Sequence, residues 1–196
     1  MPRISRVLVD GGYYHIVTRG IDRRRLFRYK HDYECFLAIV KQYQRCYAVR
    51  IINYCIMSNH IHLLLNAIKA SDLPKFMQSI LQVYAVKFRK RYGSVGFVFQ
   101  NRYKSRFIDS DSYLLECARY IERNPLRAKM VNSLSEYRWS SYSYYANGLD
   151  DGIISMLNPL YQGLAQTQQE RQEAYIKYIS EDRPYDHIVD KEFRIK

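Results

Sequence analysis

Two histidines separated by a single residue are the first side chains in the sequence with a clear potential for chemistry. His60 and His62 lie in the apolar run "YCIMSNHIHLLLNAI", residues 54–68. Because side chains alternate across a β-strand, both imidazoles are expected on one face and Ile61 on the other. Two imidazoles so placed can bind one divalent cation, whereas an aliphatic core offers them no polar partner. A metal site and a pair of hydrogen-bonded histidines explain the pattern about equally well.

A tyrosine and an asparagine one helical turn apart form the second candidate group. Tyr120 and Asn124 lie in "YLLECARYIERNPLRAKMV", residues 113–131, and on a helix they share one side. Glu116, one turn earlier, is an alternative oxygen ligand or a base. This side is predicted to lie away from the apolar stripe of Leu114, Cys117 and Ile121.

The residue types of the two groups together suit cleavage of a phosphodiester. Two histidine nitrogens and one oxygen leave coordination positions open for Mg²⁺ or Mn²⁺, although Zn²⁺ also binds imidazole. The cation would orient and polarise the phosphate, and the hydroxyl of Tyr120 would attack it in line to form a phosphotyrosine. With 20 tyrosines in the chain, any single one is most often a packing residue. The hypothesis therefore requires His60, His62 and Asn124 to converge near Tyr120.

Charge and composition favour a nucleic-acid partner. The 196 residues are enough for one domain with a tail, and the formal net charge is +12. Such an excess favours a polyanion, and abundant tyrosine favours unpaired bases over a membrane surface, because aromatic rings stack on bases. No apolar run reaches the roughly 20 residues that span a bilayer.

Candidate DNA contacts are basic residues on expected loops, a strand and a helix. Arg102, Lys104 and Arg106 alternate along an expected strand, so they share a face that suits a phosphate track. A solvated edge strand protected by charge explains them nearly as well. The full candidate set is Arg23, Arg24, Arg25, Arg102, Lys104, Arg106, Arg123 and Arg127.

The elements that must position these groups follow from residue periodicity. The pattern predicts strands at 13–18, 50–58, 60–68 and within 96–110, and helices within 30–49, 71–93 and 110–131. This β-α-β-β-α-β order with a third helix predicts an α+β, ferredoxin-like fold, in which an antiparallel sheet carries both crossover helices on one face. Asp32 is a plausible N-cap, and Pro125 is expected to disturb the third helix near Asn124.

Several spaced motifs resemble one family. "YYHIVTRG", "MSNHIHLLL", "QNRYKSRFI" and "YLLECARYIERNPLRAKMV" are similar, in this order and spacing, to HUH-type tyrosine transposases acting on single-stranded DNA. The most similar branch is the REP-associated tyrosine transposases, over about residues 10–145. The resemblance implies that His60 and His62 bind the catalytic metal, that Asn124 completes the site, and that Tyr120 forms a 5′-phosphotyrosine link and frees a 3′-hydroxyl.

The resemblance also implies a substrate, an oligomeric state and a domain boundary. It implies palindromic hairpin DNA from repetitive elements as the substrate, and a monomer with its site in cis, with a homodimer left open. It covers a transposase-like domain at 1–145 and carries nothing over to a C-terminal extension at 146–196, in which residues 167–181 are expected to be helical. His15, on a strand that this fold places beside the third, is expected to be structural or a DNA contact.

Two other functions remain open at this stage. An electropositive, tyrosine-rich sheet of RRM-like architecture could bind single-stranded DNA or RNA without cleaving it. A metallohydrolase of small substrates would explain neither the charge nor Tyr120. The N-terminus lacks a secretory signal, and four cysteines without a CxxC pair, interpreted as core residues, fit a reducing compartment, so a cytoplasmic protein is expected.

Overall fold

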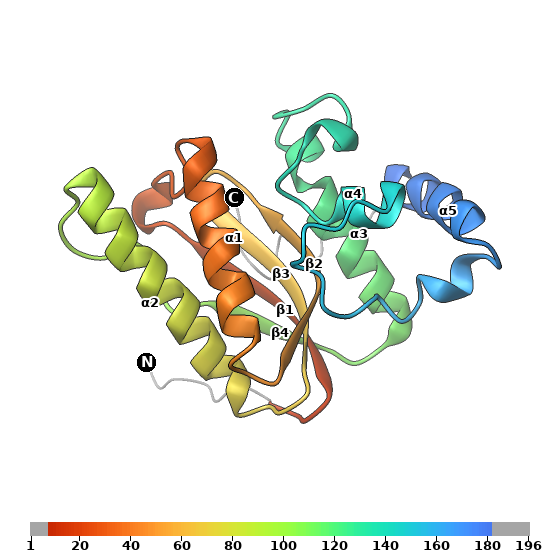
Figure 1. Cartoon of the computed structure of the whole chain (residues 1–196), viewed down its shortest axis with the longest axis horizontal. Coiled ribbons are helices and arrows are strands. Elements are labelled where there is room, and N and C mark those ends of the chain that lie inside the picture. The colour runs from red at the N-terminus through yellow and green to blue at the C-terminus, as the bar shows by residue number, and fades with distance from the viewer. Residues whose placement is uncertain (1–7, 182–196) are drawn as a thin grey trace.

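A four-stranded antiparallel sheet forms the centre of the molecule in a computed structural model that describes residues 8–181 (Figure 1). Its strand order is β2-β3-β1-β4, which leaves β2 and β4 at the edges. The strands are β1 (Gly12–Arg19), β2 (Val49–Ile56), β3 (His60–Ala67) and β4 (Lys104–Ile108). The main helices are α1 (Lys30–Gln44), α2 (Asp72–Tyr92) and α3 (Asp111–Arg127). This order and topology confirm the predicted α+β, ferredoxin-like fold with an added helix.

The alternation of side chains along β3 builds two cores, one on each face of the sheet. Ile61 and Leu63 belong to the cluster that includes residues of α1 and α2, whereas Leu64 belongs to the cluster that includes residues of α3. The crossover helices therefore cover one face and α3 covers the other (Figure 1). Of the four cysteines interpreted as core residues, Cys46 is exposed, so that part of the prediction is wrong.

Helix α1 begins earlier than an Asp32 cap would place it. Tyr29 occupies the N-cap, and Asp32 lies inside the first turn. Its buried carboxylate accepts hydrogen bonds from the backbone N–H groups of Arg28 and Tyr29, at 2.8 and 3.0 Å. It also accepts from Arg91 and Tyr92 at the end of α2. The N-cap prediction is thus wrong, because the carboxylate reaches back from the third helical position, as in a capping box.

Helix α3 continues through Pro125 to Arg127, although the sequence predicted a disturbance near Asn124. Proline has no N–H, so the carbonyl of Ile121 lacks the donor that an α-helix normally gives it. The side-chain amide of Asn124 donates to this carbonyl at 3.3 Å and to the carbonyl of Tyr120 at 2.8 Å. The asparagine thus replaces the hydrogen bond that the proline removes.

The C-terminal segment packs against α3. It contains α4 (Tyr142–Asn147) and α5 (Gln168–Ser180), and α5 confirms the helix expected at 167–181. The boundary expected after residue 145 lies inside α4. Short 3-10 turns are η1 (Ile21–Arg23), η2 (Leu134–Glu136) and η3 (Gln162–Leu164). Within residues 8–181, no helix has the length and apolar character needed to cross a membrane.

Candidate active site at the interface of the sheet and α3

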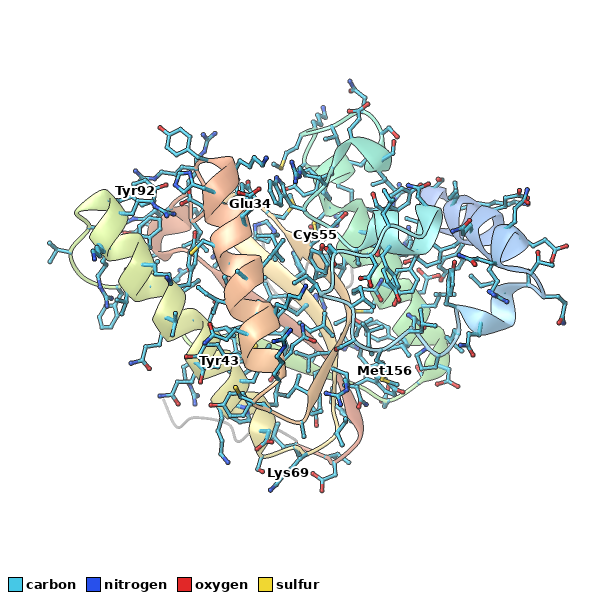
Figure 2. The ribbon with its side chains drawn as sticks, viewed as in Figure 1. Glu34, Tyr43, Cys55, Lys69, Tyr92 and Met156 are labelled. Carbon is cyan, nitrogen blue, oxygen red and sulfur yellow. The ribbon has the colours of Figure 1, made fainter. Side chains whose placement is uncertain are left out.

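The two histidines of β3 share the face that α3 covers, as their spacing predicted. His62 pairs with Val17 on β1 and with Cys55 on β2, and both of these neighbours belong to the core beneath α3. Figure 2 shows Cys55 between the sheet and α3. His60 begins β3 opposite Arg19, and the centroids of the two histidine rings are 4.9 Å apart. Both rings are buried.

The hydrogen bonds of these histidines leave one nitrogen of each ring without a partner. Nδ1 of His60 lies 2.7 Å from the amide oxygen of Asn59, which can only accept, so His60 donates from Nδ1. Nδ1 of His62 lies 3.0 Å from Nε2 of His15. The Nε2 atoms of His60 and His62 are buried and have no hydrogen-bond partner among the residues that the structure describes. Two such orphaned nitrogens side by side fit a metal site.

Burial keeps the rings in the neutral form that binds metals. Burial lowers the pKa of His60 to about 4, and the charge of Arg19 acts in the same direction. The pKa of His62 is held well below its usual value, first by burial and then by the neighbouring His60, His15 and Arg127. Burial lowers the pKa of His15 to about 3, with a smaller contribution from Arg106. At neutral pH the imidazoles can therefore act as acceptors or ligands.

Tyr120 lies directly against the histidines. Its ring meets those of His62 and His15 edge to face, with centroids 5.7 and 5.9 Å apart. The guanidinium carbon of Arg127 lies 5.1 Å from the centroid of the Tyr120 ring. Tyr120 is 1% exposed and belongs to the same apolar cluster as Cys117. The prediction that it lies away from the apolar stripe is wrong, because that stripe is wide enough to include it.

Asn124 and Glu116 differ in what their oxygens can do. The amide nitrogen of Asn124 donates to two main-chain carbonyls of its own helix. The amide oxygen of Asn124 therefore faces away from these two carbonyls. The carboxylate of Glu116 instead accepts from Nε of Arg119 at 2.9 Å and from the hydroxyl of Tyr178 at 2.6 Å. The carboxylate of Glu116 therefore lies on the side of α3 that faces α5 and is hydrogen-bonded there. This favours Asn124 over Glu116 as the oxygen ligand of a metal.

Most of the candidate DNA contacts lie near the surface, but Arg123 does not. Arg123 is 6% exposed, and Nη1 donates to the carbonyls of Ile179 and Ser180 at 3.0 and 2.7 Å. These contacts join α3 to the end of α5 and favour a structural role for Arg123, so its assignment as a DNA contact stays a prediction. In the first loop, Arg23 and Arg25 are exposed, and Arg24 is half-buried and donates to Ser94.

The basic residues of β4 lie on the same face as the histidines. Lys104 pairs with Val17, and Arg106 pairs with His15. Arg106 stacks over the ring of Tyr113 on α3, with its guanidinium carbon 4.4 Å from the ring centroid. Lys104 is exposed, and Arg102 precedes the strand and is exposed as well. The shared face predicted for these cations is thus observed for Lys104 and Arg106.

A metal would have to be held by an unusual ligand set. No group of three or more His, Cys, Asp or Glu side chains suited to a metal ion occurs within residues 8–181. The available donors are Nε2 of His60, Nε2 of His62 and the amide oxygen of Asn124. Sequence reasoning did not assign His15 to this group, since only the register of β1 against β3 brings its ring to His62.

Comparison with known proteins places this sheet and helix in a family. A family model described as "Transposase IS200 like" matches residues 8–124, more than half of the chain. The chain therefore belongs to the IS200-like transposases, a family of enzymes that generally depend on a metal ion. The matched region includes His60, His62, Tyr120 and Asn124. The match confirms the family resemblance that the sequence motifs indicated.

Two solved structures resemble the chain, and the first of them shows the same fold. One is the structure of a REP-associated tyrosine transposase bound to a REP hairpin. It is 18% identical with a TM-score of 0.64, and the match covers 80% of this chain and 92% of that one. Another, a candidate transposase from Deinococcus radiodurans R1, is 13% identical with a TM-score of 0.43, over 69% of this chain and 98% of that one. No curated protein matches the chain by sequence.

Proposed function

We propose that this transposase cleaves and joins single-stranded DNA at palindromic hairpins through a covalent link to Tyr120. The observation that carries the proposal is the contact between Tyr120 and His62, whose ring centroids are 5.7 Å apart, beside two buried and unpartnered Nε2 atoms. A tyrosine whose ring packs against a histidine with an unpartnered nitrogen combines a nucleophile with ligands for a cation, as phosphodiester cleavage requires.

The reaction has two related steps. The phenolic oxygen of Tyr120 attacks the phosphorus in line and gives up its proton to a water molecule. The bond from phosphorus to the 3′ oxygen breaks, that oxygen takes up a proton, and the DNA 5′ end remains as a phosphotyrosine. In the joining step a 3′-hydroxyl loses its proton and attacks the phosphotyrosine, the bond from phosphorus to the tyrosine oxygen breaks, and the released Tyr120 takes up a proton. Because each step exchanges one ester for another, no further co-reactant is needed.

His60, His62 and Asn124 would hold the divalent cation, Mg²⁺ or Mn²⁺. When bound, it would neutralise charge on the phosphate and make the phosphorus a better electrophile. The family's general metal dependence and the orphaned Nε2 atoms support this assignment. Arg127, beside the ring of Tyr120, adds a positive charge where the phosphate would lie.

Hairpin DNA as the substrate is supported by charge and by the structural neighbour. The net charge of +12 favours a polyanion, and the similar REP-associated transposase is bound to a REP hairpin. Exposed cations in the first loop and along β4 would contact the phosphates. One chain is enough to bring Tyr120 to the histidines, which supports a monomer with its site in cis.

Covalent capture tests the proposal. Purified protein is incubated with a 5′-labelled and, separately, a 3′-labelled single-stranded hairpin in Mn²⁺ or Mg²⁺, and adducts are resolved under denaturing conditions. We expect an adduct that retains the 3′-labelled fragment and that is absent in Tyr120→Phe. Tyr113→Phe is the matched control, since this tyrosine also lies on α3 and has a buried hydroxyl.

The binding-module alternative gives a different result. A module that only binds would retain the hairpin in a filter or mobility assay but form no adduct with either metal. An adduct formed equally by Tyr120→Phe would show that another residue is the nucleophile.

A further inference from the structure

A third histidine, His15, lies at the same site. It is neither the proposed nucleophile nor one of the proposed metal ligands, so the proposed function gives it no role. Its Nε2 atom lies 3.0 Å from Nδ1 of His62, and both side chains are fully buried. The two rings are stacked, with centroids 5.3 Å apart and an interplanar angle of 24°. In the register of β1 and β3, His15 and His62 are diagonal neighbours on adjacent strands.

The direction of this hydrogen bond decides whether His62 can bind a cation. A bond between two neutral imidazoles needs one N–H and one lone pair. If His15 donates from Nε2, then His62 accepts at Nδ1 and carries its own proton on Nε2, which cannot be a ligand. If His62 donates from Nδ1, its Nε2 atom has a lone pair directed away from His15 and can bind a metal.

We propose that His15 is a positioning residue, which accepts the Nδ1–H of His62 and so holds His62 in the tautomer whose Nε2 binds the divalent cation. This inference rests on the proposed function, since it assigns His15 to the same cation site. Histidines that bind metals regularly donate their second nitrogen to an acceptor, which fixes both tautomer and ring orientation. Here the acceptor is another imidazole.

The arrangement around His60 supports this direction. Nδ1 of His60 donates to the amide oxygen of Asn59 at 2.7 Å, and its Nε2 atom is buried without a partner. With His15 as the acceptor, His62 has the same pattern: Nδ1 donates, and Nε2 is buried without a partner. Asn59 and His15 then have the same function: each accepts the Nδ1–H of one histidine ligand, Asn59 that of His60 and His15 that of His62.

Titration with Mn²⁺ alone, followed by calorimetry, measures the effect on affinity without DNA or turnover. We expect His15→Phe, which has no acceptor, to weaken Mn²⁺ binding by about 10- to 100-fold. His15→Gln offers an amide oxygen and is expected to recover part of the affinity. His31→Phe is the matched control, because His31 lies half-exposed on α1 and its loss is expected to leave the affinity unchanged.

Nitrogen-15 NMR of the wild-type imidazoles gives a second reading that does not depend on any variant folding. We expect the shifts of His62 to show a protonated Nδ1 and an unprotonated Nε2 before metal is added. A proton on Nε2 of His62, or an affinity for Mn²⁺ within threefold of wild type in folded His15→Phe, overturns the proposal.

His60→Ala separates this inference from the proposed function. If His60→Ala binds Mn²⁺ as tightly as the wild type, the cation site itself is wrong. If His60→Ala loses binding while His15→Phe keeps it, only the role of His15 is wrong.

Discussion

The side-chain amide of Asn124 donates to the main-chain carbonyl of Tyr120, 2.8 Å away, so the proposed ligand and the proposed nucleophile are joined within one turn of α3. The same amide donates to the carbonyl of Ile121, whose normal helical donor is missing at Pro125. The Asn-Pro pair thus has a structural function that is independent of metal binding: it keeps the helix regular where the site is built.

This relationship predicts an energetic coupling between Asn124 and Pro125. Asn124→Ala leaves the buried Ile121 carbonyl without a donor and should lower the free energy of unfolding by about 1–3 kcal/mol. In a Pro125→Ala background the backbone N–H returns, so the same change should cost about 1 kcal/mol less. Urea unfolding of the two single variants and the double variant measures this coupling. Asn132→Ala, at an exposed position, is the control. Additive effects of the two substitutions would show that the amide does not replace the missing bond.

Arg127 is predicted to act on the reaction more than on the fold. Its guanidinium lies beside the ring of Tyr120 and near enough to His62 to lower the pKa of that imidazole. Arg127→Gln should slow formation of the covalent adduct by about 10- to 100-fold, since a positive charge at the attacked phosphate is removed. Arg127→Lys should recover part of the rate. Single-turnover adduct formation under saturating hairpin measures both. An unchanged rate in Arg127→Gln would place the phosphate elsewhere.

Substitutions of Arg123 and Lys104 are predicted to have opposite effects on protein stability and on DNA binding. Arg123→Met removes the donor to two carbonyls at the end of α5, of which that of Ile179 is buried, and should destabilise the protein by about 1–3 kcal/mol. Lys104→Met, at an exposed position, should change stability by less than about 0.5 kcal/mol but reduce the salt dependence of hairpin binding by about one charge. Urea unfolding and binding at several salt concentrations test the pair. A loss of salt dependence in Arg123→Met equal to that in Lys104→Met would return Arg123 to the DNA contacts.

Local patterns were sufficient to predict the sheet, its crossover helices and the face shared by His60 and His62. These follow from periods of two and of 3.6 residues, which depend only on near neighbours in sequence. Long-range packing decided the rest. The carboxylate of Glu116 and the guanidinium of Arg123 are bound by groups of α5 about 60 residues away, and His15 reaches His62 through strand register. The capping of α1 depends on the hydrogen bonds of the Asp32 side chain, and the regularity of α3 depends on those of the Asn124 side chain. Sequence periodicity does not determine such contacts.

Glu122 is predicted to make stability depend on pH. Its carboxyl group is fully buried and accepts hydrogen bonds from Asn53, Ser141 and Tyr175, which connect β2 and the C-terminal segment to α3. Burial raises the pKa of Glu122 to about 7, despite these donors. A raised pKa means that the folded state holds the proton more tightly than the unfolded state. The contribution of the protonated Glu122 to the free energy of unfolding is therefore complete below the pKa of the unfolded state, near 4.5. It is lost as the pH rises to about 7, and the total loss is about 3 kcal/mol.

Glu122→Gln isolates this effect, because its amide oxygen can accept from Asn53 and Ser141, its amide nitrogen can donate to the hydroxyl of Tyr175, and the group cannot ionise. The free energy of unfolding of Glu122→Gln minus that of the wild type should rise between pH 5 and pH 7 and level off above pH 7. The comparison cancels the opposite contribution of the buried histidines, whose lowered pKa values favour the folded state at higher pH. Glu173→Gln, an exposed change on α5, should leave the pH profile of the wild type unaltered. A difference that stays flat from pH 5 to pH 8 would mean that Glu122 is already ionised in the folded protein at the lower pH.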